Sequence, residues 1–142
     1  MIAYVDSSAI VKNYLVDETG RLELEAITSS VAGLATSRLS YVEVRAALAA
    51  ARRAGRLAPF EHDRAVESFD VAWSAYSVVE LSESVGARAG AIAEAFGLRA
   101  GDAIQLASIL ELDLDGTLIV AWDSHLRFAA RAAGVALYPA EI

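Results

Sequence analysis

Two acidic residues stand where a short apolar run gives way to a helical pattern. Asp6 follows the run from Ile2 to Val5, and Asp123 follows the run from Thr117 to Trp122. In an open α/β sheet, ligands bind beyond the carboxyl ends of the strands, so we expect both carboxylates at one edge. Either residue alone is more simply explained as an N-cap, which Asp commonly provides at such a junction.

A third carboxylate, Glu43, belongs to the Ala-rich helix expected to end at Gly55. At about 100° per residue, its side chain points away from Arg45 and into a stripe of small apolar residues that we expect to be buried. That stripe consists of Ala46, Ala47, Ala50 and Ala54, with Val44 and Ala51 beside it. A buried carboxylate is costly unless a cation or good donors compensate it. We therefore favour a metal ion as its partner over an internal ion pair with an arginine.

A fourth carboxylate, Asp102, shares a helical stripe with Leu106 and Ile109 and is expected to face the core side of its helix. It also begins the segment Asp102-Ala-Ile-Gln105, which is close to a capping box, so we expect the helix to be capped at Gly101 or Asp102. Asp residues at three helix N-termini, together with an inward Glu, would form an oxygen-rich pocket. Hard divalent cations prefer such ligands.

Apolar and helical segments alternate along the whole chain. Strands are expected at residues 2–5, 34–36, 77–81, 117–122 and 135–138. Helices are expected at 9–16, 21–31, from 37 or 40 to 55, from 59 to 76, up to 97, from 101 or 102 to 112, and from 123 to 134. This alternation predicts a single α/β domain, residues 1–142, with a parallel sheet covered by helices on both sides.

The composition excludes several classes of protein and site. Hydrophobic residues make up 56% of the chain, but none of their runs reaches the roughly 18 residues that span a bilayer. No secretory leader is evident at the N-terminus, so a cytoplasmic location is expected. The chain has no cysteine, which excludes disulfides, thiolate nucleophiles and Cys-ligated metals. Its two histidines, His62 and His125, are expected at the surface or at helix caps rather than as ligands.

The net charge of −7 argues against a protein whose whole surface grips nucleic acid. Positive charge is nevertheless concentrated between residues 38 and 56, where five arginines accompany a single Glu. Three of them, Arg45, Arg52 and Arg56, recur at i, i+7 and i+11, which places them on one helix face that could contact phosphates. An ordinary solvated helix face is the simpler interpretation of this cluster.

Four segments, taken together, resemble the motifs of PIN-domain ribonucleases of the VapC toxin type. They are Asp6-Ser-Ser-Ala-Ile-Val-Lys12, the helical Glu43, Arg99-Ala-Gly-Asp102-Ala-Ile-Gln-Leu-Ala107, and Trp122-Asp-Ser-His-Leu126. No single motif is specific, but the four occur in the family's order and spacing across nearly the whole chain. The resemblance implies a three-layer α/β/α PIN-like fold with a central, mostly parallel sheet.

The same resemblance implies a Mg²⁺- or Mn²⁺-dependent endoribonuclease toxin that cleaves RNA and is neutralised by a cognate antitoxin. It assigns Asp6, Glu43, Asp102 and Asp123 as metal ligands, with Asp6 and Asp102 the firmest. Ser8 matches a family Ser or Thr that supports the metal site. Bound Mg²⁺ would activate a water molecule and neutralise charge on the scissile phosphate. The number of ions stays open.

Two positions depart from the family pattern. Gln105 stands where a His is frequent, and Ala121 stands where a Thr precedes Trp122. Neither change removes a carboxylate. Both leave the hydrogen bonding around Asp102 and Asp123, and hence the rate or the preferred metal, open.

A second enzyme class is suggested by Asp113-Leu-Asp115-Gly-Thr-Leu118, which reproduces the phosphatase signature of haloacid-dehalogenase-like enzymes. In that class the first Asp is a nucleophile and the second a general acid. The signature should end a strand, but a helical pattern precedes it here, and the later Lys is missing because Lys12 is the sole lysine. We therefore expect Asp113 to Gly116 to form a helix-to-strand turn.

Partner surfaces are less clearly marked. Phe69, Trp73 and Tyr76 recur at helical spacing, which usually indicates core, although such a stripe can also form a groove for an antitoxin segment. The high apolar content predicts a homodimer. A third alternative is a metal-free interaction module of the same fold, against which the presence of all four acids argues.

Overall fold

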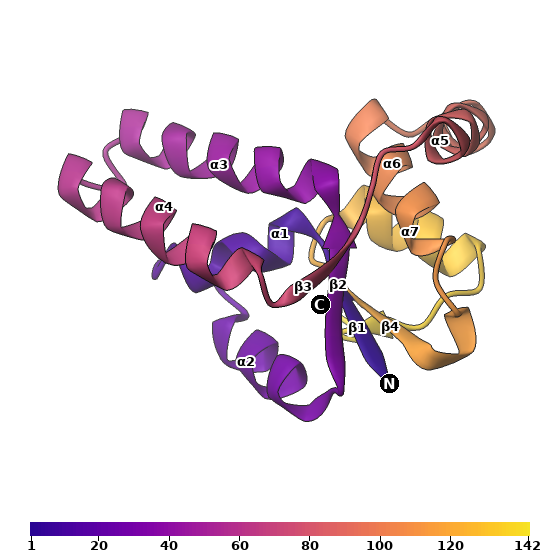
Figure 1. Ribbon diagram of the computed structural model, residues 1–142, viewed down its shortest axis with the longest axis horizontal. Coiled ribbons are helices and arrows are strands. Elements are labelled where there is room, and N and C mark those ends of the chain that lie inside the picture. Colours follow the sequence, from indigo (N-terminus) through magenta and orange to yellow (C-terminus); the bar gives the residue numbers. More distant parts are fainter.

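Five strands form a fully parallel sheet in the order β3-β2-β1-β4-β5 (Figure 1). A computed structural model describes residues 1–142, the full sequence. The strands are β1 (Ile2–Val5), β2 (Gly33–Ser37), β3 (Tyr76–Val79), β4 (Thr117–Val120) and β5 (Leu137–Tyr138). All five lie at predicted positions, with ends that differ by a few residues. The central strand is β1, in which Tyr4 pairs with Ala35 of β2 and Ile119 of β4.

Seven α-helices and two 3₁₀ turns connect the strands. The helices are α1 (Ser7–Ile10), α2 (Arg21–Ser30), α3 (Arg38–Arg53), α4 (Pro59–Trp73), α5 (Glu83–Phe96), α6 (Ala100–Ile109) and α7 (Ser124–Ala132). The turns are η1 (Val11–Asn13) and η2 (Leu114–Gly116). No helix combines the length and the apolar character that crossing a membrane requires.

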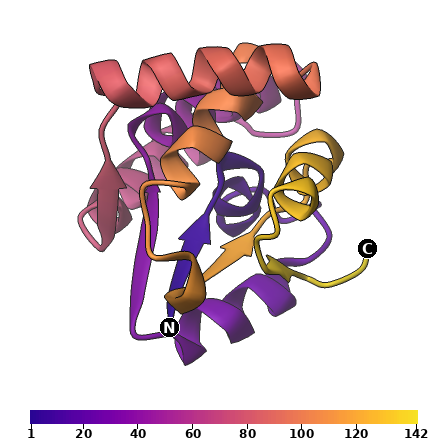
Figure 2. The same ribbon diagram turned by 90° about the vertical axis from the view of Figure 1, so that its right-hand side faces the viewer.

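The helices divide between the two faces of the sheet, as Figures 1 and 2 show. Helices α1 to α4 cover one face and α5 to α7 the other. Alternation along β1 explains both layers, because Ala3 and Val5 belong to one buried cluster and Tyr4 to the opposite one. Strands of a parallel sheet are buried on both faces, and these three side chains are fully buried. The predicted three-layer α/β/α fold is confirmed.

Helix α3 buries a different stripe from the predicted one. Its buried residues are Ser40, Val44, Leu48 and Ala51, whereas Ala46, Ala50 and Ala54 are exposed. A run rich in alanine gives a weak periodic signal, and the larger Val and Leu side chains decide which face packs. Glu43 is consequently half-buried at the margin of the core rather than surrounded by apolar side chains.

The predicted cap of α6 is also wrong. The helix begins at Ala100, and its N-cap residue is Arg99, two or three residues before the predicted cap, with no side-chain cap. Asp102 therefore lies within the first turn instead of at the cap, and its carboxylate is not engaged in capping. Two other predictions hold: Ser37 caps α3 by accepting from the Leu39 N–H, and Pro59 occupies the first turn of α4.

The aromatic stripe on α4 packs mainly into the core. Phe69 is fully buried and stacks on Tyr41 of α3 at a ring-centroid distance of 5.4 Å. Trp73 meets Tyr41 edge-on at 5.2 Å and is half-buried. Tyr76, at the start of β3, lies 5.8 Å from Trp73. The interpretation of these residues as core holds for Phe69 and in part for the other two.

Candidate metal centre

A cavity of about 260 Å³ opens at the carboxyl ends of β1 and β4. All four carboxylates singled out in the sequence line it: Asp6, Glu43, Asp102 and Asp123. They come from four different segments: the starts of α1 and α7, the second turn of α3 and the first turn of α6. The parallel topology explains this convergence, because it places the segments that follow β1, β2 and β4 at one edge of the sheet.

Asp6 is held at the wall of this cavity by Ser8. The carboxylate is 3% exposed and caps α1 by accepting from the Ala9 N–H at 3.1 Å. The Ser8 hydroxyl lies 2.8 and 3.0 Å from the two Asp6 oxygens. Ser8 also accepts from the backbone N–H groups of Trp122 and Asp123, at 3.2 and 3.3 Å. One hydroxyl therefore links the start of α1 to the start of α7.

Burial, with a smaller contribution from neighbouring negative charge, disfavours ionisation of two of these acids. Burial raises the pKa of Asp6 to about 7, and the nearby Asp123 and Glu43 charges add to that effect, while the bonds from Ser8 and Ala9 oppose it. Burial likewise raises the pKa of Asp102, again with a contribution from Asp123. Such shifts are typical of carboxylates clustered in a functional site.

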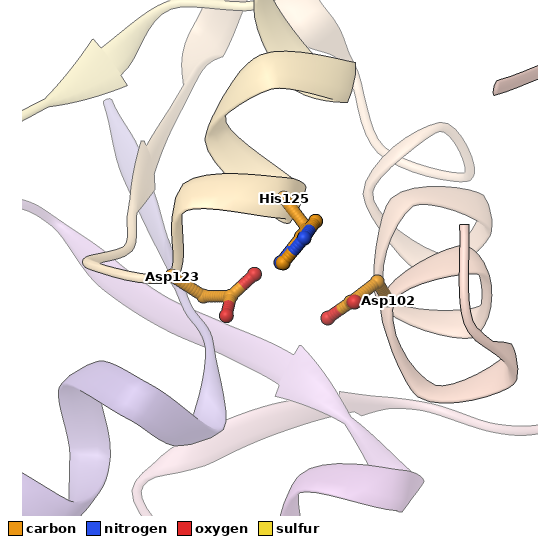
Figure 3. Close-up of side chains that lie close together, drawn as sticks. All are labelled: Asp102, Asp123 and His125. Atoms are coloured by element: carbon orange, nitrogen blue, oxygen red, sulfur yellow. The ribbon is translucent and has the colours of Figure 1, made fainter. Parts of the chain in front are cut away.

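Asp102 and Asp123 converge with a histidine that the sequence analysis did not favour as a ligand. One ligand atom from each of Asp102, Asp123 and His125 lies within 4.8 Å of the others (Figure 3). Asp123 caps α7 through Oδ2, which accepts from the Leu126 N–H at 2.9 Å. His125 follows two residues later in the same first turn. That proximity to a predicted ligand was the signal available in the sequence.

The chemistry of these donors fits a divalent cation. Asp102 Oδ2 is buried and has no hydrogen-bond partner, although the Arg99 guanidinium lies 3.6 Å away. A buried polar atom without a partner is rare and needs a physical reason. A cation among three or four carboxylates would satisfy this oxygen and offset both the burial cost and the repulsion that raise the pKa of Asp6.

Glu43 is oriented by α6. Gln105, which is buried, donates from Nε2 to Glu43 Oε1 at 2.8 Å and to Ser40 Oγ at 2.9 Å, and its Oε1 accepts from the Tyr4 hydroxyl. One turn earlier, Gly101 lies beside the second oxygen of Glu43, since a Cβ at this position would be 3.4 Å from Oε2, about van der Waals contact. The amide thus takes the place of the histidine frequent in the family pattern and keeps a donor toward Glu43.

The arginine cluster is only partly a helix face. Arg56 lies beyond the end of α3 and pairs with Asp17 and Glu18 at 2.8 and 3.2 Å, so the expectation that it shares the helix face is wrong. Arg45 is on α3 and donates to the Tyr41 hydroxyl at 2.7 Å. Arg52 is exposed and forms no ion pair or side-chain hydrogen bond. It is the member of the trio that is free to meet a ligand.

The phosphatase signature lies away from the cavity. Asp113 accepts from the Asp115 N–H at 3.2 Å and caps η2, so the segment is the predicted helix-to-strand turn. Because η2 precedes β4, these acids stand at the amino end of the strand whose carboxyl end carries Asp123. The two sets of acids therefore lie at opposite ends of the parallel strands.

Comparisons with known proteins agree with this architecture. Residues 3–132 match the PIN domain family. Ribonuclease VapC45 of Mycobacterium tuberculosis is 40% identical over 141 residues, covering 99% of this chain and 97% of the relative. Among solved structures, FitAcB from Neisseria gonorrhoeae has a TM-score of 0.72 at 19% identity, covering 99% of this chain and 98% of that one. A toxin–antitoxin complex from Klebsiella pneumoniae has a TM-score of 0.59, also at 19% identity, covering 86% and 87%.

Proposed function

The chain belongs to the PIN domain family, and from that premise we propose that it is a divalent-metal-dependent endoribonuclease, the toxin of a toxin–antitoxin pair. A relative that is 40% identical over nearly the full length carries the name ribonuclease, which supports hydrolysis of RNA. The observation that carries the metal dependence is the unpartnered Asp102 Oδ2 in a cavity lined by three further carboxylates.

Asp6, Glu43, Asp102 and Asp123 would hold the metal, for which Mg²⁺ and Mn²⁺ are the proposed ions. A divalent cation bound there supplies a water of lowered pKa and neutralises charge that develops on the scissile phosphate. The chain's own contribution is to fix the ligands before RNA arrives. Ser8 holds Asp6, the first turn of α7 holds Asp123, and Gln105 holds Glu43.

We also propose that the arginines of α3 contact RNA phosphates outside the cavity. Arg52 supplies an uncommitted positive charge, and Arg45 a second one that is paired to Tyr41 and, at 3.9 Å, to Asp70. Contacts of this kind to phosphates strengthen binding without reading sequence. Arg56, committed to Asp17 and Glu18, is the weakest candidate of the three.

A cognate antitoxin is the proposed regulatory partner, supported by the likeness of the fold to a chain of a toxin–antitoxin complex. We also propose a homodimer and a cytoplasmic location. Several large apolar side chains are exposed, among them Val16, Leu22, Phe60, Val71 and Phe128, and a partner chain could cover some of them.

Purified protein and RNA test the proposal. The chain should cleave RNA when Mg²⁺ or Mn²⁺ is present, stop when EDTA is added, and resume when the ion is restored in excess. Cleavage that continued undiminished in EDTA would contradict the metal dependence. An intact, folded chain that cleaved no RNA with either ion would contradict the activity itself.

A further inference from the structure

His125 lies in the first turn of α7, two residues beyond the N-cap Asp123. The Cα–Cβ bonds of a helix tilt toward its N-terminus, so a side chain at this position is directed back over the cap. Figure 3 shows the result: the imidazole and the carboxylates of Asp102 and Asp123 point into the same space. One ligand atom of each lies within 4.8 Å of the other two.

The imidazole is not committed to the protein. Neither of its ring nitrogens takes part in a hydrogen bond, and the residue is exposed, so no packing or capping role accounts for its placement. The only other histidine differs, because His62 Nδ1 lies 3.4 Å from Asp63 on the surface of α4. Asp102 Oδ2 also forms no hydrogen bond. His125 and Asp102 therefore each have a ligand atom that forms no hydrogen bond, and both residues lie close to Asp123.

We propose that His125 is a nitrogen ligand to the ion held by Asp102 and Asp123, and that the site therefore selects first-row transition ions such as Mn²⁺ over Mg²⁺. This inference rests on the metal dependence proposed above and adds the identity of the ion. Mg²⁺ prefers oxygen donors and gives up its waters reluctantly. Imidazole favours the transition ions, increasingly so from Mn²⁺ to Co²⁺.

Calorimetric titration of the RNA-free protein with each ion alone tests the proposal without relying on cleavage. His125→Ala should weaken Co²⁺ binding by at least about tenfold, Mn²⁺ binding by less, and Mg²⁺ binding least of all. His62→Ala is the matched control and should leave all three affinities unchanged. The melting temperatures of both variants report whether the fold is intact.

A second measurement observes the ligand directly. With two histidines in the chain, ¹⁵N-histidine labelling gives two sets of ring resonances, which the two alanine variants assign. Diamagnetic Zn²⁺ should shift the ring nitrogens of His125 and leave those of His62 in place. Equal losses of Mg²⁺ and Co²⁺ affinity in His125→Ala, or unshifted His125 nitrogens in the Zn²⁺-loaded protein, would overturn the proposal.

The outcome is separable from that of the proposed function. If the graded loss and the His125 shift are found but the chain cleaves no RNA, the ligand assignment stands and the ribonuclease activity is wrong. If RNA is cleaved with metal, but His125→Ala keeps the wild-type metal affinities and Zn²⁺ does not shift the His125 nitrogens, the activity stands and the ligand assignment is wrong.

Discussion

Gln105 of α6 donates a hydrogen bond of 2.8 Å to the Glu43 carboxylate of α3, and so ties together the two helices that flank the acidic cavity. A carboxylate can only accept, so the amide must turn its NH₂ toward Glu43 and its oxygen toward Tyr4, whose hydroxyl donates. The second N–H reaches Ser40 Oγ, and Thr36 continues the chain to the Val5 carbonyl. Glu43 is thereby connected to the backbone immediately before Asp6.

Replacing Gln105 by Leu should disable this network without changing the volume of the core greatly. Tyr4 and Ser40 would lose a buried partner, which costs about 1–3 kcal/mol of the free energy of unfolding. Glu43 would lose its donor, and Mn²⁺ affinity should fall about tenfold, as when other supports of metal ligands are removed. Denaturant unfolding and Mn²⁺ titration check both effects. Gln105→His keeps a donor toward Glu43 and should retain most of the affinity. Equal loss in both variants would contradict the positioning role.

Asp6→Asn should stabilise the metal-free protein at neutral pH. The unfolded chain releases the Asp6 proton near the ordinary pKa of 3.8, whereas the folded protein, whose Asp6 pKa is about 7, retains it. Ionisation therefore destabilises the fold progressively from about pH 4 to pH 7, by at most about 4 kcal/mol above that range. The melting temperature of Asp6→Asn should exceed that of the wild type most near pH 8. Below pH 4 the two melting temperatures should be equal. A gain that was constant across this range would contradict the raised pKa.

The position of Trp122, next to Asp123, depends on a glycine. Gly20 has φ +90°, and a Cβ at this position would lie 2.7 Å from the Trp122 ring. On the same ring, Lys12 Nζ lies 4.8 Å from the centroid. Gly20→Ala should combine left-handed strain of about 1–2 kcal/mol with displacement of the indole. Gly55→Ala is the control, because Gly55 has φ +76° but nothing within 4 Å of its Cβ position.

Thermal unfolding and the emission of Trp122, measured in a background in which Trp73 is replaced by Phe, separate the two effects. Gly20→Ala should lower the melting temperature more than Gly55→Ala and should shift the emission, while Gly55→Ala leaves the emission unchanged. Equal stability losses and identical spectra would show that Gly20 does not determine the position of the indole.

Arg52 should contribute more to RNA binding than Arg56. Each arginine that contacts a phosphate steepens the dependence of affinity on salt. Arg52→Ala, alone or with Arg45→Ala, should therefore reduce the slope of log affinity against log salt. Arg56→Ala removes a charge already paired with Asp17 and Glu18 and should leave the slope close to that of the wild type. Slopes measured on a catalytically inactive background, in which Asp102 is replaced by Asn, check this. Unchanged slopes in every variant would contradict this role and indicate that the arginines form an ordinary solvated face.

The sequence was informative wherever a signal was local and strong. The run Thr117 to Val120, the cap at Asp123 and the helix-to-strand turn at Asp113 follow from apolar runs and capping chemistry, which act within a few residues. The orientation of α3 was not predictable in the same way. Alanines on several sides of that helix make its periodicity ambiguous, and packing by Val44 and Leu48 decides it.

The contacts of Gln105 and His125 could not be predicted from local sequence patterns, for a different reason. The role of Gln105 depends on partners about 60 to 100 residues away, Glu43, Ser40 and Tyr4, which only the tertiary fold brings together. A lone histidine on a helix is commonly a surface or capping residue, so the sequence did not indicate that His125 is a ligand. Its closeness to Asp102 arises from the packing of α6 against α7, which no spacing within one helix reveals.

The most direct test of the account compares two sets of acids that the fold places at opposite ends of the parallel strands. Asp102→Asn removes a carboxylate from the cavity, and Asp113→Asn with Asp115→Asn alters the turn before β4. Each protein is assayed with Mn²⁺ on RNA and on a chromogenic phosphomonoester. We predict that Asp102→Asn abolishes RNA cleavage while remaining folded, and that the turn variant cleaves RNA close to the wild-type rate. RNA cleavage by Asp102→Asn at the wild-type rate, or phosphomonoester hydrolysis that disappears with Asp113 and Asp115, would contradict the account.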